Sequence, residues 1–182
     1  GSLIGVFCGT GVGGGVVIGG DLWRGRGAAG EIGHMVVMAD GAKCTCGRLG
    51  CMEAYAGRAA MEIEARRRVA AGEKTKLFKI MKKKDKPRLA SGVWDKALRK
   101  HDPMAEELVD RAIWALGNGI ASAVNLLDVE AVIIGGGLGL RLGQPFVDRI
   151  KEAMMPHLVL ALHPPDVLLA AMGDLGGALG AA

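Results

Sequence analysis

The sequence has 182 residues, a length that normally forms one domain and can bury roughly 70% of its unfolded surface around one core. Half of the residues are apolar but only 4% are aromatic, so a core must consist mainly of aliphatic side chains. The net charge of +4 permits an anionic partner without requiring one. The longest uncharged stretch, 112–127, is shorter than the roughly 20 residues of a membrane span, so we expect a soluble protein.

The chain opens with a predicted β-hairpin. Residues 3–8 form an apolar run typical of a buried strand, 16–18 predict a second strand, and the glycines within 9–15 turn between them. Gly1-Ser2 directly before a strand-like run is typical of a cloning remnant at a truncation point, so we expect a shortened chain.

Helical patterns dominate the middle of the chain. Residues 33–38 continue the β-rich part, 39–50 have loop composition, and 51–71 have helical spacing. The weaker pattern of 77–100 predicts short helices. Asp102-Pro103, a cap followed by a first-turn proline, predicts the start of a long helix that reaches Leu127.

The last third alternates strands and helices. We expect a strand over 131–134 that runs into three glycines, a helix over 145–155, a strand over 167–171 and a helix that begins at 176. This alternation predicts an α/β domain with a β-hairpin start and later strand-helix units.

Four side chains within 18 residues have the composition of a structural zinc site. Three thiolates and one imidazole complete a tetrahedral Zn²⁺ and leave no open position for water, so the site would be structural. The alternative is a set of unrelated thiols beside a surface histidine. The candidate ligands are His34, Cys44, Cys46 and Cys51.

Two carboxylates flank this cluster, Glu31 before it and Glu53 after it. Carboxylates on a metal-braced scaffold suit the recognition of sugar hydroxyls, because each accepts several hydrogen bonds. The alternative places Glu31 as a turn cap and Glu53 in the first turn of a helix, where the helix dipole favours it.

Two glycine clusters are candidates for nucleotide contact. The segment 9–15 contains G-x-G-x-x-G, but Val16-Val17-Ile18 follows it instead of a helix, so it is not a dinucleotide fingerprint. A glycine-rich hairpin can still present backbone N–H groups and the Thr10 hydroxyl to a phosphate, or it can be only a tight turn. The triplet Gly135-Gly136-Gly137 follows a buried strand, where adenosine could lie against bare backbone, although a simple strand-to-helix turn remains the alternative.

A run of positive charge, Lys79 to Arg88, is typical of a solvated face. A nucleic-acid site is the other interpretation, but only Phe78 lies nearby and no recognition motif accompanies the run. We therefore expect no nucleic acid to bind through this chain.

In combination and order, these motifs resemble the ROK family of sugar kinases and sugar-responsive repressors. The resemblance covers G-T-G-V-G-G-G, G-A-A-G-E-I-G-H, C-T-C-G-R-L-G-C-M-E-A-Y, A-V-I-I-G-G-G and G-D-L-G-G-A-L-G-A-A, which extend from residue 9 to residue 182. It implies an actin-like, ribonuclease-H-like two-lobed kinase, of which residues 1–182 form the C-terminal lobe with a zinc loop at 34–51.

The resemblance also implies site residues. Glu31 and Glu53 would bind sugar hydroxyls, and His34 would ligate zinc through one nitrogen while its other nitrogen faces the sugar. The phosphate and adenosine motifs would comprise Gly9, Thr10, Gly11 and Gly13, and then Gly135, Gly136 and Gly137.

Two family elements have no counterpart here: the first phosphate motif, D-x-G-x-T, and the Asn-Asp pair whose Asp is the general base. Both are expected upstream, so we name no catalytic residue and expect the isolated chain to be inactive. The whole protein is expected to be a cytoplasmic, homodimeric, glucokinase-like hexose kinase that uses Mg-ATP. The main alternative is the sugar-sensing effector domain of a ROK repressor, and a third is a nucleic-acid-binding zinc module.

Overall fold

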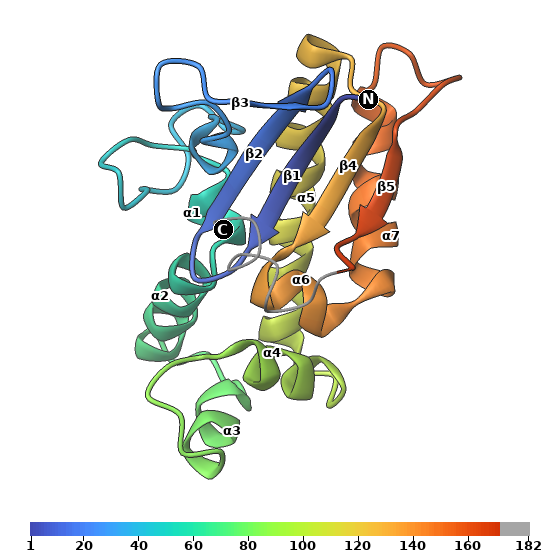
Figure 1. Ribbon diagram of the computed structural model, residues 1–182. Coiled ribbons are helices and arrows are strands. Elements are labelled where there is room, and N and C mark those ends of the chain that lie inside the picture. The colour runs from blue at the N-terminus through green and yellow to red at the C-terminus, as the bar shows by residue number, and fades with distance from the viewer. Residues whose placement is uncertain (172–182) are drawn as a thin grey trace.

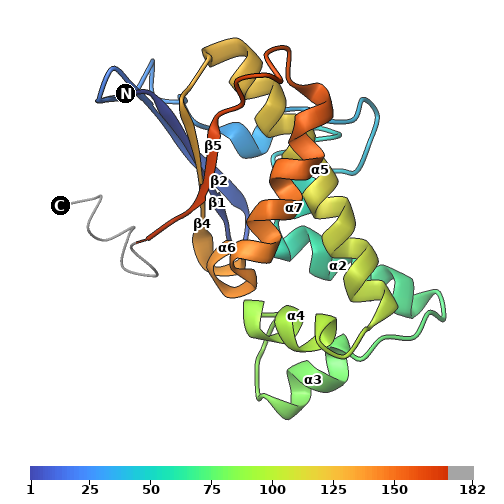
Figure 2. The same ribbon diagram turned by 90° about the vertical axis from the view of Figure 1, so that its right-hand side faces the viewer.

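The fold is a five-stranded mixed sheet with its long helices packed on one face. The computed structural model describes residues 1–171, and the sheet has the order β3-β2-β1-β4-β5. Figure 1 shows this sheet in front of helices α5 and α7, and Figure 2, viewed along the sheet edge, shows both helices on the same side. The expected α/β class is confirmed.

The opening hairpin forms as expected, but its turn is shorter than predicted. β1 (Leu3–Cys8) pairs antiparallel with β2 (Val12–Ile18), so the turn contains only residues 9–11 and the other glycines lie inside β2. Packing explains one of them, since a Cβ on Gly14 would lie 2.7 Å from Ile32 Cγ2 and from the Gly5 carbonyl oxygen. The sequence analysis missed β3 (Asp21–Trp23), which is too short to show a period.

The other half of the sheet is parallel. β1 pairs with β4 (Ala131–Gly135), and β4 pairs with β5 (Asp166–Leu169). The carboxyl ends of these three strands therefore lie at one edge of the sheet, which is where parallel sheets place ligands. In Figure 1 this is the lower edge, beside α6 (Gly136–Leu142), a helix that the sequence analysis did not expect.

Helix α5 (Pro103–Leu127) begins and ends where its sequence predicts. The Asp102 carboxylate accepts from the Ala105 N–H at 2.9 Å, and Asp128 ends the helix with a positive φ of 48°. Gly117 permits close approach to α7 (Gln144–Met154), because a Cβ there would lie 2.7 Å from Ala153 Cβ. This glycine therefore lies where the two helices pack closely.

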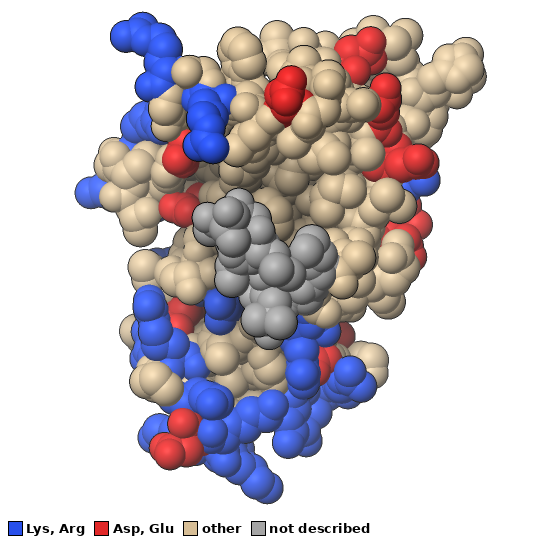
Figure 3. Space-filling view, in the orientation of Figure 1, with Lys and Arg blue, Asp and Glu red and all other residues tan. Residues whose placement is uncertain are grey.

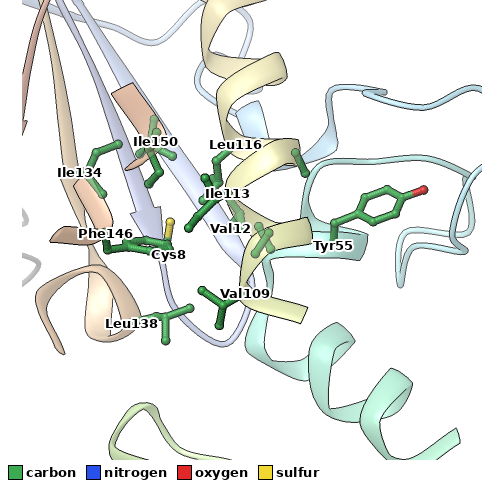
Figure 4. Packing of buried hydrophobic residues seen from close by; sticks show 14 of the residues in the cluster. Cys8, Val12, Tyr55, Val109, Ile113, Leu116, Ile134, Leu138, Phe146 and Ile150 are labelled. Carbon is green, nitrogen blue, oxygen red and sulfur yellow. The ribbon is translucent and has the colours of Figure 1, made fainter. Parts of the chain in front are cut away.

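Aliphatic side chains from the sheet and from α5 form the core. Figure 4 shows strand and helix residues converging between the two layers. Alternate residues of β1 point toward α5 and are fully buried, whereas Phe7, which points the other way, is 47% exposed. The labelled core residues include Cys8, Val109, Ile113, Leu116, Ile134, Phe146 and Ile150.

Two predicted elements that adjoin the loop of residues 34–51 differ from the structure. Residues 33–38 do not form a strand: a single 3-10 turn, Ile32–His34, is followed by one isolated bridge between Val36 and Cys51. The helix predicted over 51–71 is two helices, α1 (Glu53–Ala56) and α2 (Arg58–Ala70), because Gly57 adopts an extended conformation with ψ of 131°. A Cβ on Gly57 would lie 2.9 Å from the Glu53 carbonyl oxygen, so the break needs glycine.

Short helices occupy 77–98, as expected. α3 (Leu77–Lys83) and α4 (Ser91–Leu98) pack together below the sheet in Figure 1, and a 3-10 turn, Met155–His157, follows α7. No helix among residues 1–171 is both long enough and apolar enough to cross a bilayer. The helix expected from 176 lies outside the described residues.

Asp102→Ala should destabilise the protein by about 2–4 kcal/mol. Its buried carboxylate accepts from the Ala105 N–H, the Lys76 N–H and the Thr75 hydroxyl, so the variant loses a helix cap and leaves two further donors unpaired. Asp110→Ala on the same helix is the control, because its exposed pair with Arg149 contributes less than about 1 kcal/mol. Urea unfolding measures both, and equal losses would contradict the assigned role.

Candidate functional site

Residues 34–51 form the metal-ligand loop, which lies between the β1–β2 hairpin and helix α1. Its four predicted ligands converge, since the ligand atoms of His34, Cys44, Cys46 and Cys51 all lie within 4.8 Å of one another. Cys44 Sγ is 3.8 Å from His34 Nδ1, and Cys46 Sγ is 3.7 Å from Cys51 Sγ. Ligands bonded to one tetrahedral Zn²⁺ at about 2.3 Å lie about 3.8 Å apart, so the donor set fits such an ion.

The electrostatics of the thiols also favour a cation. A hydrogen bond with Arg48 lowers the pKa of the Cys46 thiol to about 6, whereas burial raises that of Cys51 to about 12. A second thiolate next to the first is therefore costly without a positive charge between them. Cys8 is different, because it is buried in the core away from the loop and burial raises its pKa to about 12.

Protein contacts brace the loop as well. Residues 43 and 49 form a bridge, and the Cys44 N–H donates to the Arg48 carbonyl at 2.8 Å, which closes a small hairpin inside the loop. The Tyr55 hydroxyl accepts from the Ala42 N–H at 2.7 Å, and its ring packs edge-on against Trp114. The sequence analysis missed Tyr55, although an aromatic residue next to a metal motif is a usable signal.

Glu53 connects the loop to the hairpin. Its Oε2 accepts from the Val12 N–H at 2.9 Å, and its Oε1 accepts from the Thr45 hydroxyl at 3.2 Å and lies 3.8 Å from Cys44 Sγ. A Cβ on Gly11 would overlap Oε2, so only glycine leaves room for this carboxylate. Glu53 does lie in the first turn of α1, as the alternative interpretation expected.

The hairpin turn presents its amides on one side. The carbonyls of Gly9 and Thr10 accept from the N–H groups of Arg58 and Ala59, at the start of α2. In a trans peptide the C=O and the following N–H point in opposite directions, so the N–H groups of Thr10 and Gly11 point away from α2. Within residues 1–171 these two N–H groups have no acceptor, as a turn that binds an anion requires.

Arg58 adds a positive charge that the sequence analysis did not select. Its Nε donates to the Gly9 carbonyl at 3.2 Å, and its Nη2 lies 3.5 Å from the Thr10 hydroxyl. Burial, and to a smaller extent nearby Arg88, lowers the pKa of Arg58, but an arginine stays charged at neutral pH. No signal in the sequence indicated Arg58, because residues 51–71 predicted one continuous helix.

A pocket of about 800 Å³ opens beside Glu53. It extends from the hairpin turn across the metal loop to α2 and α5, and four of the predicted site residues line it: Thr10, Gly11, Cys44 and Glu53. Most of its remaining wall is apolar, with Lys43, Glu64, Arg67 and Arg111 as charged exceptions.

The other predicted residues lie outside this pocket. Glu31 is exposed at the start of the 3-10 turn, and its carboxylate makes no hydrogen bond within residues 1–171. Packing accounts for two of the three glycines at the junction of β4 and α6. A Cβ on Gly135 would lie 2.8 Å from Phe7 Cδ1, and Gly136 has a φ of +77° and lies against the Cys8 backbone. Among residues 1–171, a Cβ on Gly137 would have only Ser91 Oγ within 4 Å, at 3.4 Å, so this glycine has the most room of the three.

Comparison with known proteins places this geometry in a family. The model of the ROK family matches residues 1–182. A glucokinase of Streptomyces coelicolor is 35% identical over 186 aligned residues, which cover all of this chain and 58% of that enzyme. The chain thus spans little more than half the length of this relative.

Solved structures agree. A ROK glucokinase of Streptomyces griseus, in complex with glucose and AMPPNP, matches with a TM-score of 0.79 and 32% identity over all of this chain and 59% of its own. A ROK transcriptional regulator, a homologue of the E. coli MLC protein, matches with a TM-score of 0.77 and 25% identity over 92% of this chain and 41% of its own. The expected fold of a ROK sugar kinase is confirmed.

Gly11→Ala should destabilise the protein by about 1–3 kcal/mol, whereas Gly13→Ala should change its stability by less than about 0.5 kcal/mol. The first new methyl group displaces the Glu53 carboxylate and breaks its bond to the Val12 N–H, and the second meets nothing within 4 Å. Neither glycine has a positive φ, so backbone strain does not separate them. Urea unfolding gives both values, and equal effects would show that Glu53 does not depend on Gly11.

Proposed function

This chain belongs to the ROK family, and from that premise we propose that it forms the sugar- and ATP-binding C-terminal lobe of an ATP-dependent, glucokinase-like hexose kinase. One observation carries the proposal: the carboxylate of Glu53 contacts the start of β2, directly after the glycine turn, and also the metal-ligand loop. A sugar hydroxyl and a nucleotide phosphate bound to these two elements would be neighbours, as phosphoryl transfer requires.

Three side chains are proposed to bind the sugar. Glu53 Oε2 accepts one hydrogen bond, from the Val12 N–H, and Oε1 accepts from the Thr45 hydroxyl beside Cys44 Sγ, which leaves lone pairs for sugar hydroxyls. Glu31 has its whole carboxylate available. His34 places Nδ1 beside Cys44 Sγ, so its Nε2 remains to bind a hydroxyl. The two carboxylates orient the sugar as acceptors, and the Nε2–H of His34 orients it as a donor.

The glycine turn is proposed to bind the phosphates of Mg-ATP. The N–H groups of Thr10 and Gly11 have no acceptor within the described chain and point away from α2, and the Arg58 guanidinium lies next to them. Together they stabilise negative charge on a phosphoryl group. Gly137, at the carboxyl edge of the sheet, is proposed to contact the adenosine.

Zn²⁺ is proposed for the loop, with a structural role. It would neutralise the thiolates of Cys44, Cys46 and Cys51 and complete its coordination with His34. Because Thr45 and Glu53 lie next to these ligands, fixing the loop also fixes the carboxylate that binds the sugar.

The whole protein would need a second lobe. The general base and the first phosphate motif are proposed to come from it, so the present chain supplies one wall of an open cleft. When the reactants are not oriented, the reaction loses much of the barrier reduction that positioning supplies, which reaches about 7–11 kcal/mol. We further propose that the protein lies in a reducing, cytoplasmic compartment, because free thiols at metal-ligand spacing require reducing conditions. We also propose that it is a homodimer, as the resemblance to the ROK family implies.

A sugar-sensing effector domain is the second candidate. The likeness to the ROK transcriptional regulator supports it, because such a domain would use the same metal loop and carboxylates. The glycine turn with two available amides favours the kinase. A sugar-dependent change in operator DNA binding by the complete protein, without phosphorylation of that sugar, would select the regulator.

Purified chain should contain one equivalent of zinc, and Cys46→Ser should lower this below about half an equivalent, because a structural site needs all four ligands. Cys8→Ala is the matched control, since the Cys8 thiol is buried in the core and should leave the metal content unchanged. Elemental analysis measures both. Metal-free wild-type protein with freely titratable thiols would contradict the zinc proposal.

The 182-residue chain should not phosphorylate glucose, whereas the complete protein should do so. In the complete protein, Glu53→Gln should lower kcat/KM for glucose by about 10- to 100-fold through loss of charge-assisted hydrogen bonds, with zinc retained. Glu152→Gln, exposed on α7, makes the same charge change outside the site and should leave activity unchanged.

A coupled assay on rigorously purified protein gives these values. Activity of the chain alone that disappears in its Glu31→Ala variant would mean that the chain contains a base after all. An unchanged kcat/KM in Glu53→Gln would remove Glu53 from the sugar site.

A further inference from the structure

Positive charge concentrates in one small part of the molecule. Residues 74–100 contain eleven Lys and Arg against two Asp, a net charge of +9, so the remainder of the 182-residue chain has a net charge of −5. Figure 3 shows the lysines and arginines gathered over the lower end, where α3 and α4 lie in Figure 1. The modest overall charge of the protein therefore conceals a strongly polarised surface.

Two helical stripes of lysine face each other across a groove. Lys76, Lys79 and Lys83 lie three to four residues apart along α3, and Lys96 and Lys100 are four apart along α4 and its end. The groove between them has a volume of about 400 Å³, and these five lysines line it together with buried Ile80. It shares no lining residue with the pocket beside Glu53.

Local acidic groups do not neutralise these lysines. No salt bridge within residues 1–171 contains a lysine. Asp95 pairs with Arg99 and Arg141, and the Asp102 carboxylate is buried on backbone and hydroxyl donors. Like charges at this spacing destabilise a helix, so an external anion would stabilise the arrangement.

We propose that this groove is a second binding site, for a compact oligophosphate anion. Its charged wall consists of ammonium groups alone, which act as point charges on phosphate from several directions, whereas planar carboxylates favour guanidinium forks. The shared chemistry is a chain of phosphates, either free or as the tail of a nucleotide. This site lies outside the pocket that holds Glu53 and is independent of the kinase proposal.

Larger anionic partners fit the surface less well. A nucleic acid needs stacking aromatics or a large contact area, but Arg66 covers the ring of Phe78 at 4.9 Å and Trp94 is fully buried. An anionic membrane normally adds apolar anchors, and none of the exposed large apolar side chains of residues 1–171 belongs to 74–100. A small concave site with several cations fits a small multivalent anion.

Calorimetric titration of the 182-residue chain with inorganic tripolyphosphate tests the proposal. We expect saturable binding to the groove, beside any binding to the glycine turn, and the groove affinity should fall by about tenfold or more in the double variant Lys79→Gln with Lys96→Gln, because each substitution removes a charge-assisted contact. The matched control is Lys82→Gln with Lys151→Gln, which removes the same charge outside the groove and should change affinity by less than about twofold. Urea unfolding confirms that all variants are folded.

Titrations with ATP and with a single-stranded oligonucleotide identify the anion. If the groove variant weakens ATP in parallel with tripolyphosphate, the source is the nucleotide tail; if it weakens only tripolyphosphate, the source is a free oligophosphate. Equal weakening by both double variants, or no saturation, would reduce the groove to diffuse charge and overturn the proposal. Tighter binding of a single-stranded oligonucleotide than of tripolyphosphate would also overturn it.

Discussion

The carboxylate of Glu53 is the contact on which the candidate site depends. It accepts from Val12 at the start of β2 and from Thr45 inside the metal-ligand loop, and it occupies the space that Gly11 leaves by having no side chain. Sheet, loop and helix α1 therefore meet at one charged group. Because a partly buried carboxylate needs these donors, its position and theirs are mutually determined, and the loop cannot move without altering the turn.

In the glycine turn, too, one set of contacts serves two purposes. The first residues of α2 donate to the carbonyls of Gly9 and Thr10, which satisfies the start of the helix and fixes the orientation of two peptide planes. The amides on the opposite side of those planes are then available for an anion. Arg58 belongs to the same helix start, so one structural junction both holds the turn and places a cation next to it.

Much of this could be predicted from the sequence, because local chemistry determined it. A short-range signature marks three features: the candidate metal ligands from His34 to Cys51, the helix cap at Asp102 and the strand before Gly135. The failures share a different cause. The extent of the turn and the space beside Gly11 depend on atoms distant in sequence, and so in part does the break at Gly57, where a Cβ would also lie 3.2 Å from Gly11 Cα. A run of glycines could not show which of them faces a backbone, a carboxylate or open space.

The division of charge follows from the same fold. The pocket beside Glu53 is lined mostly by apolar residues with charges of both signs, whereas residues 74–100, the α3–α4 unit, have a net charge of +9. Asp102 links the α3–α4 unit to the core. Its carboxylate accepts hydrogen bonds from the residues before α3 and from the start of α5, the helix that packs on the sheet. A charge bound between α3 and α4 therefore acts on a segment anchored to the core, so its binding energy bears on how α3 and α4 are held against α5.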